Sequence, residues 1–430
     1  MRILIRNATI LPMDTRDHVM RGSIAIEGRK IVAVGEVPPG FVADKVIDAE
    51  QCIALPGLVN AHTHASMVYF RNYRDSVSDL HDWLQEIWRL EDTLVPSDIR
   101  SASKLAIAEM ILGGTTCFSD MYFFQEETVS AIMESGIKAN VGLTLFGDEE
   151  DSARRIERSL GFLRQARDRS DRMLRYDIAP HAVYTCTPGT YRLAAAVARE
   201  EGCKVHTHAS ETAREVTECK AQYGRTPVSH LDSLGILEGG AYLAHVVHPD
   251  ESDIALLARR QVTVIHNPSS NCKLGSGIAP LHAYQEANVP LALGTDGASS
   301  NNALDMFQEL RLAAMLASVS TGNPTALSPY DLLHMATAGG ARALGRETEC
   351  GSIETGKDAD IILIDTSGAH MSPLNNPFSA LVYSAKSSDI KTVICAGRML
   401  MEDRVLQTID LKAVTEEVLD LWRNIQGREG

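Results

Sequence analysis

Eight short apolar stretches alternate with helical patterns through the middle of this chain, and this alternation restricts its fold more than any other feature. We predict strands at 57–62, 115–120, 139–146, 176–180, 203–208, 241–245, 262–267 and 290–296. Helical patterns such as 97–114 and 188–202 fall between them. Strands that alternate with helices form parallel sheets, and eight such units close a barrel. The pattern therefore predicts an α/β fold with a (β/α)₈ TIM-like barrel.

A doubly wound open sheet is the alternative arrangement of the same elements. That fold binds its ligand at one crevice, commonly through G-x-G-x-x-G after the first strand. The first predicted strand is not followed by this motif, and polar residues recur at the ends of several strands. We therefore favour the closed barrel.

Both ends of the chain consist of short strand patterns separated by glycine turns. They are ILIRNATIL and SIAIEGRKIVAVG near the start, and CGSIETGKDADIILID and DIKTVICAGRMLMED near the end. Two segments of the same character predict one small β-sandwich domain formed by both chain ends. We expect this domain to comprise 1–55 and 350–430, including a terminal helix, with the catalytic barrel at 56–349. Two unrelated β caps are the alternative.

Charge and cysteine content restrict the partners and the compartment. The net charge of -15 would repel phosphate backbones and anionic lipid, so we expect neither nucleic acid nor a membrane as partner. The eight cysteines form no C-x-x-C pair, which is typical of a reducing compartment. The first residues read as a strand, and no window reaches eighteen apolar residues. We therefore expect a cytoplasmic protein, and we also expect a homo-oligomer.

Residues that can bind a metal or transfer a proton end four of the predicted strands. His62 and His64 end the first strand and point to one side, because alternate residues of a strand share a face. His208 ends the fifth strand, His245 the sixth and Asp296 the eighth. A single buried histidine is usually a hydrogen-bonded core residue, but five such groups at one rim are typical of an active site. Imidazole and carboxylate together suit Zn²⁺ or a similar divalent ion.

Five segments resemble the amidohydrolase superfamily. They are GLVNAHTHASM (57–67), HASET (208–212), LAH (243–245), HNPSSNCKLGSGIAP (266–280) and LGTDGASSNN (293–302). The split β domain and GSIETGKDADIILID extend the resemblance over essentially the whole chain. More narrowly, the segments are similar to the branch that holds methylthioadenosine/S-adenosylhomocysteine deaminases and s-triazine hydrolases.

This resemblance implies a mononuclear metal site and a hydrolytic deamination. It implies one divalent ion, Zn²⁺ with Fe²⁺ as the alternative, and metal ligands at His62, His64, His208 and Asp296. It further implies that Glu211 and His245 handle protons and that Asp296 accepts the proton of the attacking water. The expected substrate is an adenosine-type nucleoside such as 5'-methylthioadenosine or S-adenosylhomocysteine. The alternative is an s-triazine or guanine-type aminohydrolase, and a non-catalytic metal-storage module is the rival outside enzymology.

The segment VHTHASET (205–212) contains a second His-x-His, whose two histidines share a strand side. The His-x-x-Glu pattern of the family selects His208 as the ligand. We interpret His206, one layer deeper in the barrel, as a packed or supporting residue. The end of the fourth predicted strand, YDIAPHAVY, has no lysine, which disfavours a dinuclear site bridged by carbamylated lysine.

Three residues are candidates for substrate binding. Glu91 ends LHDWLQEIWRLED (80–92), which is similar to a stretch that in the deaminases leads to a ribose-binding glutamate. Trp83 is assigned as an aromatic that stacks on the base, with Trp88 as the alternative. His181 in APHAVYTCT matches a histidine that contacts substrate in that family. The roles of Arg154 and Arg155 stay open, because DSARRIER also fits a solvated helix face.

Overall fold

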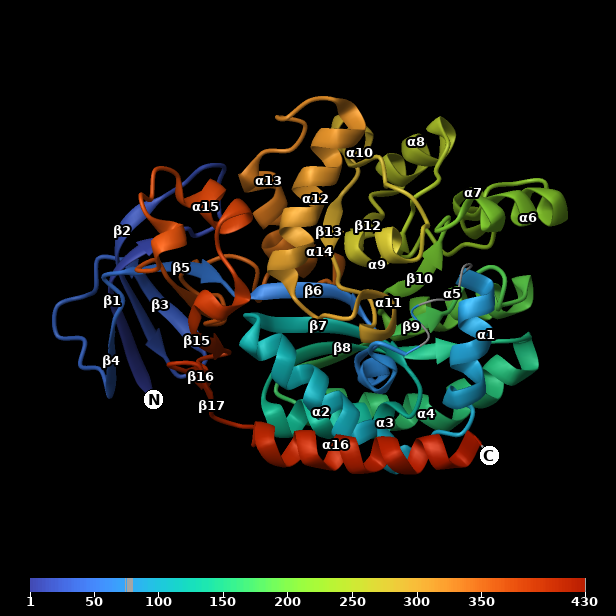
Figure 1. Ribbon diagram of the computed structural model, residues 1–430, viewed down its shortest axis with the longest axis horizontal. Helices are drawn as coiled ribbons and strands as arrows, with labels where there is room; N and C mark the ends of the chain where they lie inside the picture. The colour runs from blue at the N-terminus through green and yellow to red at the C-terminus, as the bar shows by residue number, and fades with distance from the viewer. Residues whose placement is uncertain (74, 76–79, 430) are drawn as a thin grey trace.

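An eight-stranded parallel sheet curves into a nearly closed barrel beside a second, mixed sheet (Figure 1). The structure is a computed structural model that describes residues 1–73, 75 and 80–429. The barrel strands are β6 (Leu58–Thr63), β7 (Thr115–Tyr122), β8 (Lys138–Leu145), β9 (Leu174–Pro180), β10 (Val205–Ala209), β11 (Ala241–His245), β12 (Thr263–His266) and β13 (Leu291–Leu293). Each overlaps a predicted strand, and the predicted TIM-like barrel is confirmed.

Polar contacts at the rim join the first barrel strand to the end of the last. The backbone N–H of Asp296 donates to the carbonyl of His62 at 2.9 Å. The backbone N–H of Thr295 donates to the side-chain oxygen of Asn60 at 2.9 Å, and the Asn60 amide donates to Thr295 Oγ1 at 2.7 Å. The closure of the ring therefore brings together candidate ligands that lie more than two hundred residues apart in the sequence.

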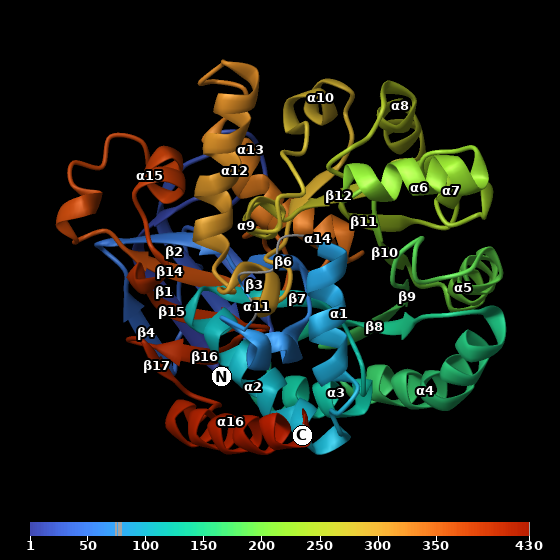
Figure 2. The ribbon, with the colours of Figure 1, turned by 45° about the vertical axis from the view of Figure 1, so that its right-hand side comes forward.

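Helices cover the outside of the barrel, as Figure 2 shows. The main ones are α2 (Pro96–Leu112), α3 (Gln125–Ser135), α4 (Glu149–Arg169), α5 (Pro188–Glu201), α6 (Ala213–Tyr223), α7 (Pro227–Ser233), α8 (Glu251–Arg260), α10 (Leu281–Glu286), α12 (Met306–Thr321) and α13 (Pro329–His334). Helix α5 illustrates their local signals. The Thr187 side chain accepts from the N–H of Thr190, Pro188 opens the first turn, and Gly202 ends the helix at φ 62°.

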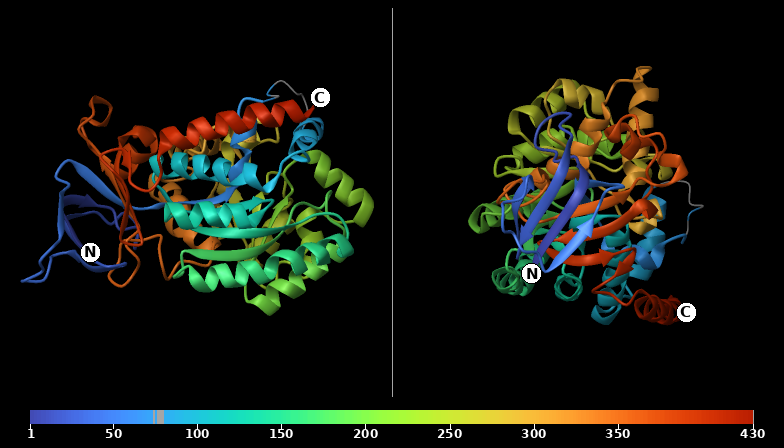
Figure 3. Two further views of the ribbon diagram at one scale, coloured as in Figure 1. Left: turned by 90° about the horizontal axis from the view of Figure 1, so that it is seen from below. Right: turned by 90° about the vertical axis from the view of Figure 1, so that its left-hand side faces the viewer.

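Strands from both chain ends form one nine-stranded sheet, and Figure 3 shows them side by side. They are β1 (Arg2–Ile10), β2 (Met20–Glu27), β3 (Lys30–Gly35), β4 (Lys45–Asp48), β5 (Cys52–Pro56), β14 (Ile361–Asp365), β15 (Ile390–Cys395), β16 (Arg398–Glu402) and β17 (Val405–Leu406). Strand β5 pairs with β1 on one side and with β14 on the other. This pairing confirms a β unit built from both ends, and the domain limits 1–55, 56–349 and 350–430 stay a prediction.

A buried ion cluster joins the β unit to the amino-terminal end of the barrel. Lys138, at the start of β8, is fully buried and pairs with Asp360 and, at 2.9 Å, with Asp358. Asp358 also pairs with Arg29 and Lys30 of the β unit, each at 2.8 Å. Removing one partner from such a cluster leaves a buried charge and costs about 3–5 kcal/mol. The β unit is therefore anchored at the end of the barrel opposite the rim.

The last long helix, α16 (Leu411–Gln426), packs along α2 on the outside of the barrel (Figure 1). An ion pair of 2.7 Å between Arg428 and Asp98 follows it. This agrees with the expected terminal packing helix. Within the described ranges, we find that every helix is too short or too polar to cross a membrane. The cytoplasmic location and the homo-oligomer stay predictions.

Candidate metal centre and active site

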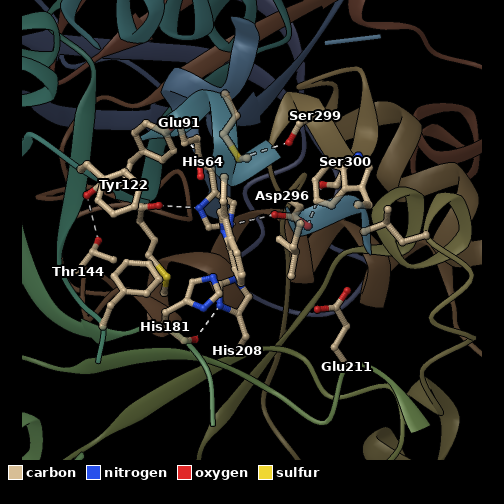
Figure 4. A pocket seen from close by; sticks show the side chains of 18 of the residues that line it. His64, Glu91, Tyr122, Thr144, His181, His208, Glu211, Asp296, Ser299 and Ser300 are labelled. Carbon is tan, nitrogen blue, oxygen red and sulfur yellow. Dashed lines mark hydrogen bonds and ion pairs between the residues drawn. The ribbon is translucent and has the colours of Figure 1, made fainter. Parts of the chain in front are cut away.

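The residues at the strand ends converge at the carboxyl-terminal rim of the barrel. Figure 4 shows three of them, His64, His208 and Asp296, facing one another. Asp296 Oδ1 lies 3.2 Å from His64 Nε2 and 3.3 Å from His62 Nε2. The rings of His62 and His208 are 4.8 Å apart between centroids. Ligand atoms of His62, His64 and Asp296 lie within 4.8 Å of one another, and so do those of His62, His208 and His245. The structure therefore brings all five predicted strand-end groups together.

Hydrogen bonds leave the inward nitrogen of two histidines free to bind a cation. His64 Nδ1 lies 2.6 Å from the carbonyl of Met121, and His208 Nδ1 lies 2.8 Å from the carbonyl of His181. A carbonyl oxygen only accepts, so Nδ1 of each ring carries the hydrogen and donates it. In the neutral rings, Nε2 then carries the lone pair that a metal needs.

The donor set fits a divalent metal. His62 Nε2 is buried and makes no hydrogen bond within the described ranges, although Asp296 lies 3.3 Å away. A buried polar nitrogen of this kind needs a partner. Three imidazole nitrogens and one carboxylate, from His62, His64, His208 and Asp296, are typical ligands of Zn²⁺. These four residues could hold one such ion.

Asp296 is held as an ionised carboxylate. Its oxygens accept from Ser270 Oγ at 2.6 Å, from Ser300 Oγ at 3.0 Å and from the Gly297 N–H at 2.8 Å. Burial opposes its charge, but contacts with His62 and His64 outweigh burial and keep the pKa of Asp296 well below its usual range. Its backbone is left-handed, at φ 61°, a conformation that is costly for a non-glycine residue and persists only where the surrounding structure holds it.

The charge of Asp296 also acts on His64. Burial disfavours the protonated ring, yet Asp296 raises the pKa of His64 to about 9. The site thus favours a positive charge next to Asp296, which either a proton or a metal ion supplies. This electrostatic preference agrees with the donor set.

Glu211 follows β10 and points into the same site. Its Oε1 accepts from Ser276 Oγ at 3.2 Å, and its Oε2 lies 3.7 Å from His245 Nε2. Glu215 holds the backbone in place, because its carboxylate accepts from the N–H groups of Ser210 and Glu211 at 2.9 and 2.7 Å. Burial raises the pKa of Glu211. A buried carboxyl of this kind holds a proton more readily than an exposed one, which suits a general acid or base.

His245 lies between the two carboxylates of the site. Its Nδ1 is 2.8 Å from the side-chain oxygen of Asn271, to which it donates. Its Nε2 is 3.7 Å from Glu211 Oε2 and 3.9 Å from Asp296 Oδ2. Like Asp296, His245 has a left-handed backbone, at φ 74°. Nε2 of the ring therefore faces both carboxylates across the site.

A cavity opens above these groups, and apolar or aromatic side chains form most of its wall. They include Met67, Trp83, Leu84, Trp88, Phe123, Phe146, Tyr184 and Leu274. Three of the four candidate ligands border the cavity together with the proton-handling groups and one substrate candidate: His64, His208, Asp296, Glu211, His245 and His181. Glu91 also borders it. An apolar cavity with a few convergent polar groups suits a flat aromatic substrate.

The three predicted substrate residues all line this cavity. Glu91, at the end of α1 (Leu80–Glu91), accepts from the Tyr122 hydroxyl at 2.6 Å, and burial raises the pKa of Glu91 to about 7. Trp83 is 4% exposed, and within the described ranges its indole nitrogen has no hydrogen-bond partner. His181 stacks on Phe146, and burial lowers the pKa of His181 to about 3, so its ring is neutral.

Sequence reasoning missed the residues that hold the reactive groups. Two serines, Ser270 and Ser300, donate to Asp296, and Asn271 accepts from His245. All three lie inside the HNPSSN and TDGASSN segments quoted above. Their place beside the ligands was the available signal, because a hydroxyl or an amide in such a loop can reach a neighbouring strand end. Glu215, four residues after Glu211, carried no comparable signal.

The structure separates the two arginines whose roles were open. Arg154 pairs with Glu150 and Asp151 on the exposed face of α4. Arg155 instead lines a second cavity with Arg158, and Glu91 borders both this cavity and the first. Two arginines therefore line a cavity that shares Glu91 with the first cavity.

Comparisons with known proteins agree with the geometry of the site. A model of the amidohydrolase family matches residues 53–400. The chain is 42% identical to a 5-methylthioadenosine/S-adenosylhomocysteine deaminase of Pelotomaculum thermopropionicum, over 99% of both chains. It is 36% identical to an adenosine deaminase from Xanthomonas campestris that was solved with bound zinc. The TM-score is 0.92, and the match covers 99% of this chain and 98% of that one. A zinc complex of atrazine chlorohydrolase from Arthrobacter aurescens TC1 gives a TM-score of 0.91 at 27% identity. This match covers 98% of this chain and 100% of that one. The chain belongs to the amidohydrolase family.

Proposed function

We propose that the chain is a metal-dependent hydrolytic deaminase of an adenosine-type nucleoside, such as 5'-methylthioadenosine or S-adenosylhomocysteine. It releases ammonia and the inosine analogue. The observation that carries the proposal is the position of Glu211 and His245, 3.7 Å apart, at the base of an aromatic cavity beside three converging imidazoles. The similarity to proteins named as deaminases supports it.

His62, His64, His208 and Asp296 would hold one divalent ion, Zn²⁺ with Fe²⁺ as the alternative. When bound, an ion of this kind lowers the pKa of water from ~15.7 to about 7 and so supplies a nucleophile at neutral pH. The carbonyl acceptors behind His64 and His208 keep those rings oriented for this task.

The residues of the chain move the protons of the reaction. Asp296, ionised, accepts a proton from the attacking water, and His245 orients that water from the side. Glu211, protonated, donates to the ring nitrogen next to the attacked carbon and makes that carbon more electrophilic. A carbon–oxygen bond forms, and the bond to the exocyclic amine breaks as the proton taken up by Asp296 passes to the amine. The remaining hydroxyl proton returns to Glu211 as the carbonyl forms. One water is consumed, and ammonia leaves.

The cavity wall positions the nucleoside. Trp83 stacks on the purine, and the neutral His181 offers a hydrogen bond to it. Glu91 accepts hydrogen bonds from the ribose hydroxyls at the outer part of the cavity. Arg155 and Arg158 border the space beyond Glu91, toward which a 5' substituent extends.

A panel assay of ammonia release tests the proposed substrate class. The substrates are 5'-methylthioadenosine, S-adenosylhomocysteine, adenosine, 5'-deoxyadenosine, guanine and melamine. We expect the highest kcat/KM for one of the four adenosine compounds, because the cavity combines an aromatic wall with a carboxylate for ribose. Faster turnover of guanine or melamine would instead favour the guanine-type or s-triazine aminohydrolase.

Glu91→Ala should lower kcat/KM for the best ribonucleoside by roughly tenfold to a hundredfold. The loss of a charged hydrogen-bond acceptor costs ~1.5–3 kcal/mol. On a 2',3'-dideoxy analogue, which offers no hydroxyl to Glu91, the variant and the wild type should have similar kcat/KM. Steady-state kinetics on both compounds measure the effect.

Two controls isolate the ribose contact of Glu91. The variant also leaves the Tyr122 hydroxyl without its partner, but that loss affects both substrates equally and cancels in the ratio of kcat/KM. Glu416→Ala removes an exposed carboxylate on the outer helix α16, where it pairs with Lys412, and should leave kcat/KM for both substrates unchanged. Equal losses on both substrates in Glu91→Ala would mean that Glu91 supports the cavity wall and does not bind the sugar.

A further inference from the structure

One of the candidate ligands is supported differently from the others. His64 and His208 donate to backbone carbonyls. Nδ1 of His62 instead lies 3.0 Å from Nε2 of His206, a side chain. His206 is fully buried beneath the rim. The acceptor behind His62 is therefore a ring whose own hydrogen position must be set by something else.

A chain of hydrogen bonds continues from His206 across the barrel interior. His206 Nδ1 is 3.4 Å from Ser119 Oγ, and Ser119 Oγ is 3.0 Å from the Tyr242 hydroxyl. That hydroxyl donates to Asp177 Oδ2 at 2.8 Å. These residues and His62 come from five different strands, and each is at most 3% exposed. We call the set of five the barrel relay.

The two ends of the barrel relay determine the direction of every bond in it. If Nε2 of His62 binds a cation, Nδ1 carries the hydrogen, so His206 must accept at Nε2 and donate from Nδ1. Ser119 then accepts from His206 and donates to Tyr242. The Tyr242 hydroxyl is left to donate to Asp177, whose carboxylate only accepts. Only one direction satisfies all four bonds.

The far end of the barrel relay is firmly held. Asp177 accepts from the Asn140 amide at 2.7 Å and from the Lys204 N–H at 3.1 Å, in addition to Tyr242. Asn140 in turn accepts from the fully buried Arg346 at 2.8 Å. The ring of Tyr242 also stacks on His206, with centroids 4.2 Å apart. His206 therefore has both its orientation and its hydrogen position fixed from behind.

We propose that His206 is a positioning residue for the metal ligand His62, and that the barrel relay to Asp177 sets the tautomer and orientation of both rings. This proposal rests on the metal site of the proposed function. An acceptor behind a ligating imidazole fixes the ring and raises its basicity, and its loss typically weakens metal binding by roughly 10–100-fold.

Zinc affinity of the full-length chain tests the proposal without any substrate. Competition with a chromophoric chelator gives the Kd of each variant. His206→Phe removes the acceptor and should weaken zinc binding by roughly 10–100-fold. His206→Gln should recover affinity close to that of the wild type, because its amide can accept from His62 and donate to Ser119. Tyr242→Phe keeps the stacked ring, breaks the relay beyond Ser119, and should give an intermediate loss.

Tyr191→Phe is the matched control for Tyr242→Phe. Tyr191 is also fully buried, and its hydroxyl lies 3.3 Å from Thr207 Oγ1, outside the barrel relay. Its loss should leave zinc affinity unchanged. Thermal unfolding of the zinc-free proteins shows which variants fold, and Tyr242→Phe, the smallest change, preserves the test if His206→Phe does not fold.

The outcomes separate this proposal from the proposed function. Equal zinc affinity in Tyr242→Phe and Tyr191→Phe, or wild-type affinity in a folded His206→Phe, would overturn the barrel relay alone. Zinc binding that depends on the relay, in a protein that releases no ammonia from any substrate of the panel, would overturn the proposed function alone.

Discussion

Glu211→Gln is expected to lower kcat for the best adenosine-type substrate by ~10²–10⁴-fold while metal stays bound, because a general acid of this type contributes about that much. Glutamine has nearly the same shape and can still accept from Ser276, but it has no proton to transfer. It lies outside the proposed ligand set, so zinc content should be unchanged. Ammonia release and elemental analysis of the same preparation measure both quantities.

Glu218→Gln is the control for this substitution. Glu218 lies on the exposed side of α6, where it pairs with Arg214, and the variant should behave as the wild type. Full activity of Glu211→Gln would refute the proton-transfer role. A site that merely stores metal needs no carboxyl at position 211, so a large loss of kcat at constant zinc would also exclude the storage module.

His64→Ala and Asp296→Ala should each remove bound metal and turnover together. A site of four protein ligands loses a quarter of its donors in either variant. Asp296→Ala also removes the acceptor of the Ser270 hydroxyl and one of the two acceptors of the Ser300 hydroxyl. The charge that favours a cation at this position disappears with Asp296. Metal content by elemental analysis and ammonia release should fall in parallel.

An imidazole outside the site serves as the control for these two variants. His282 lies on α10 on the outside of the barrel, 3.5 Å from Glu286, and His282→Ala should keep both metal and activity. Stoichiometric zinc or iron in both His64→Ala and Asp296→Ala would count decisively against the proposed ligand set.

The barrel and its rim were predictable because they depend on local periodicity. Each strand was visible as a short apolar run, and the carboxyl ends of parallel strands necessarily share one rim. The two-residue period of a strand places His62 and His64 on one side without knowledge of any other strand. The β unit from both ends was predictable because its strands share one character, although the pairing of β5 with β14 could only be seen in the fold.

Neighbouring arginines show where local reasoning ends. Arg154 and Arg155 differ by one position on α4, and successive residues of a helix point in directions about 100° apart. Only the packing of α4 against the barrel decides which one reaches a cavity. Arg154 lies among acidic residues of its own helix, and Arg155 borders the space beyond Glu91.

Which groups reach the rim could be predicted from the strands one at a time, because strand period and strand polarity are properties of each segment. Which groups support them became visible only in the closed barrel. His206 and His208 share one strand side, yet only His208 lines the cavity wall, while His206 lies below and contacts His62 from β6, 144 residues earlier. Such contacts cross the barrel, and they depend on the order and stagger in which eight strands close the ring. No periodicity within a single strand encodes that order.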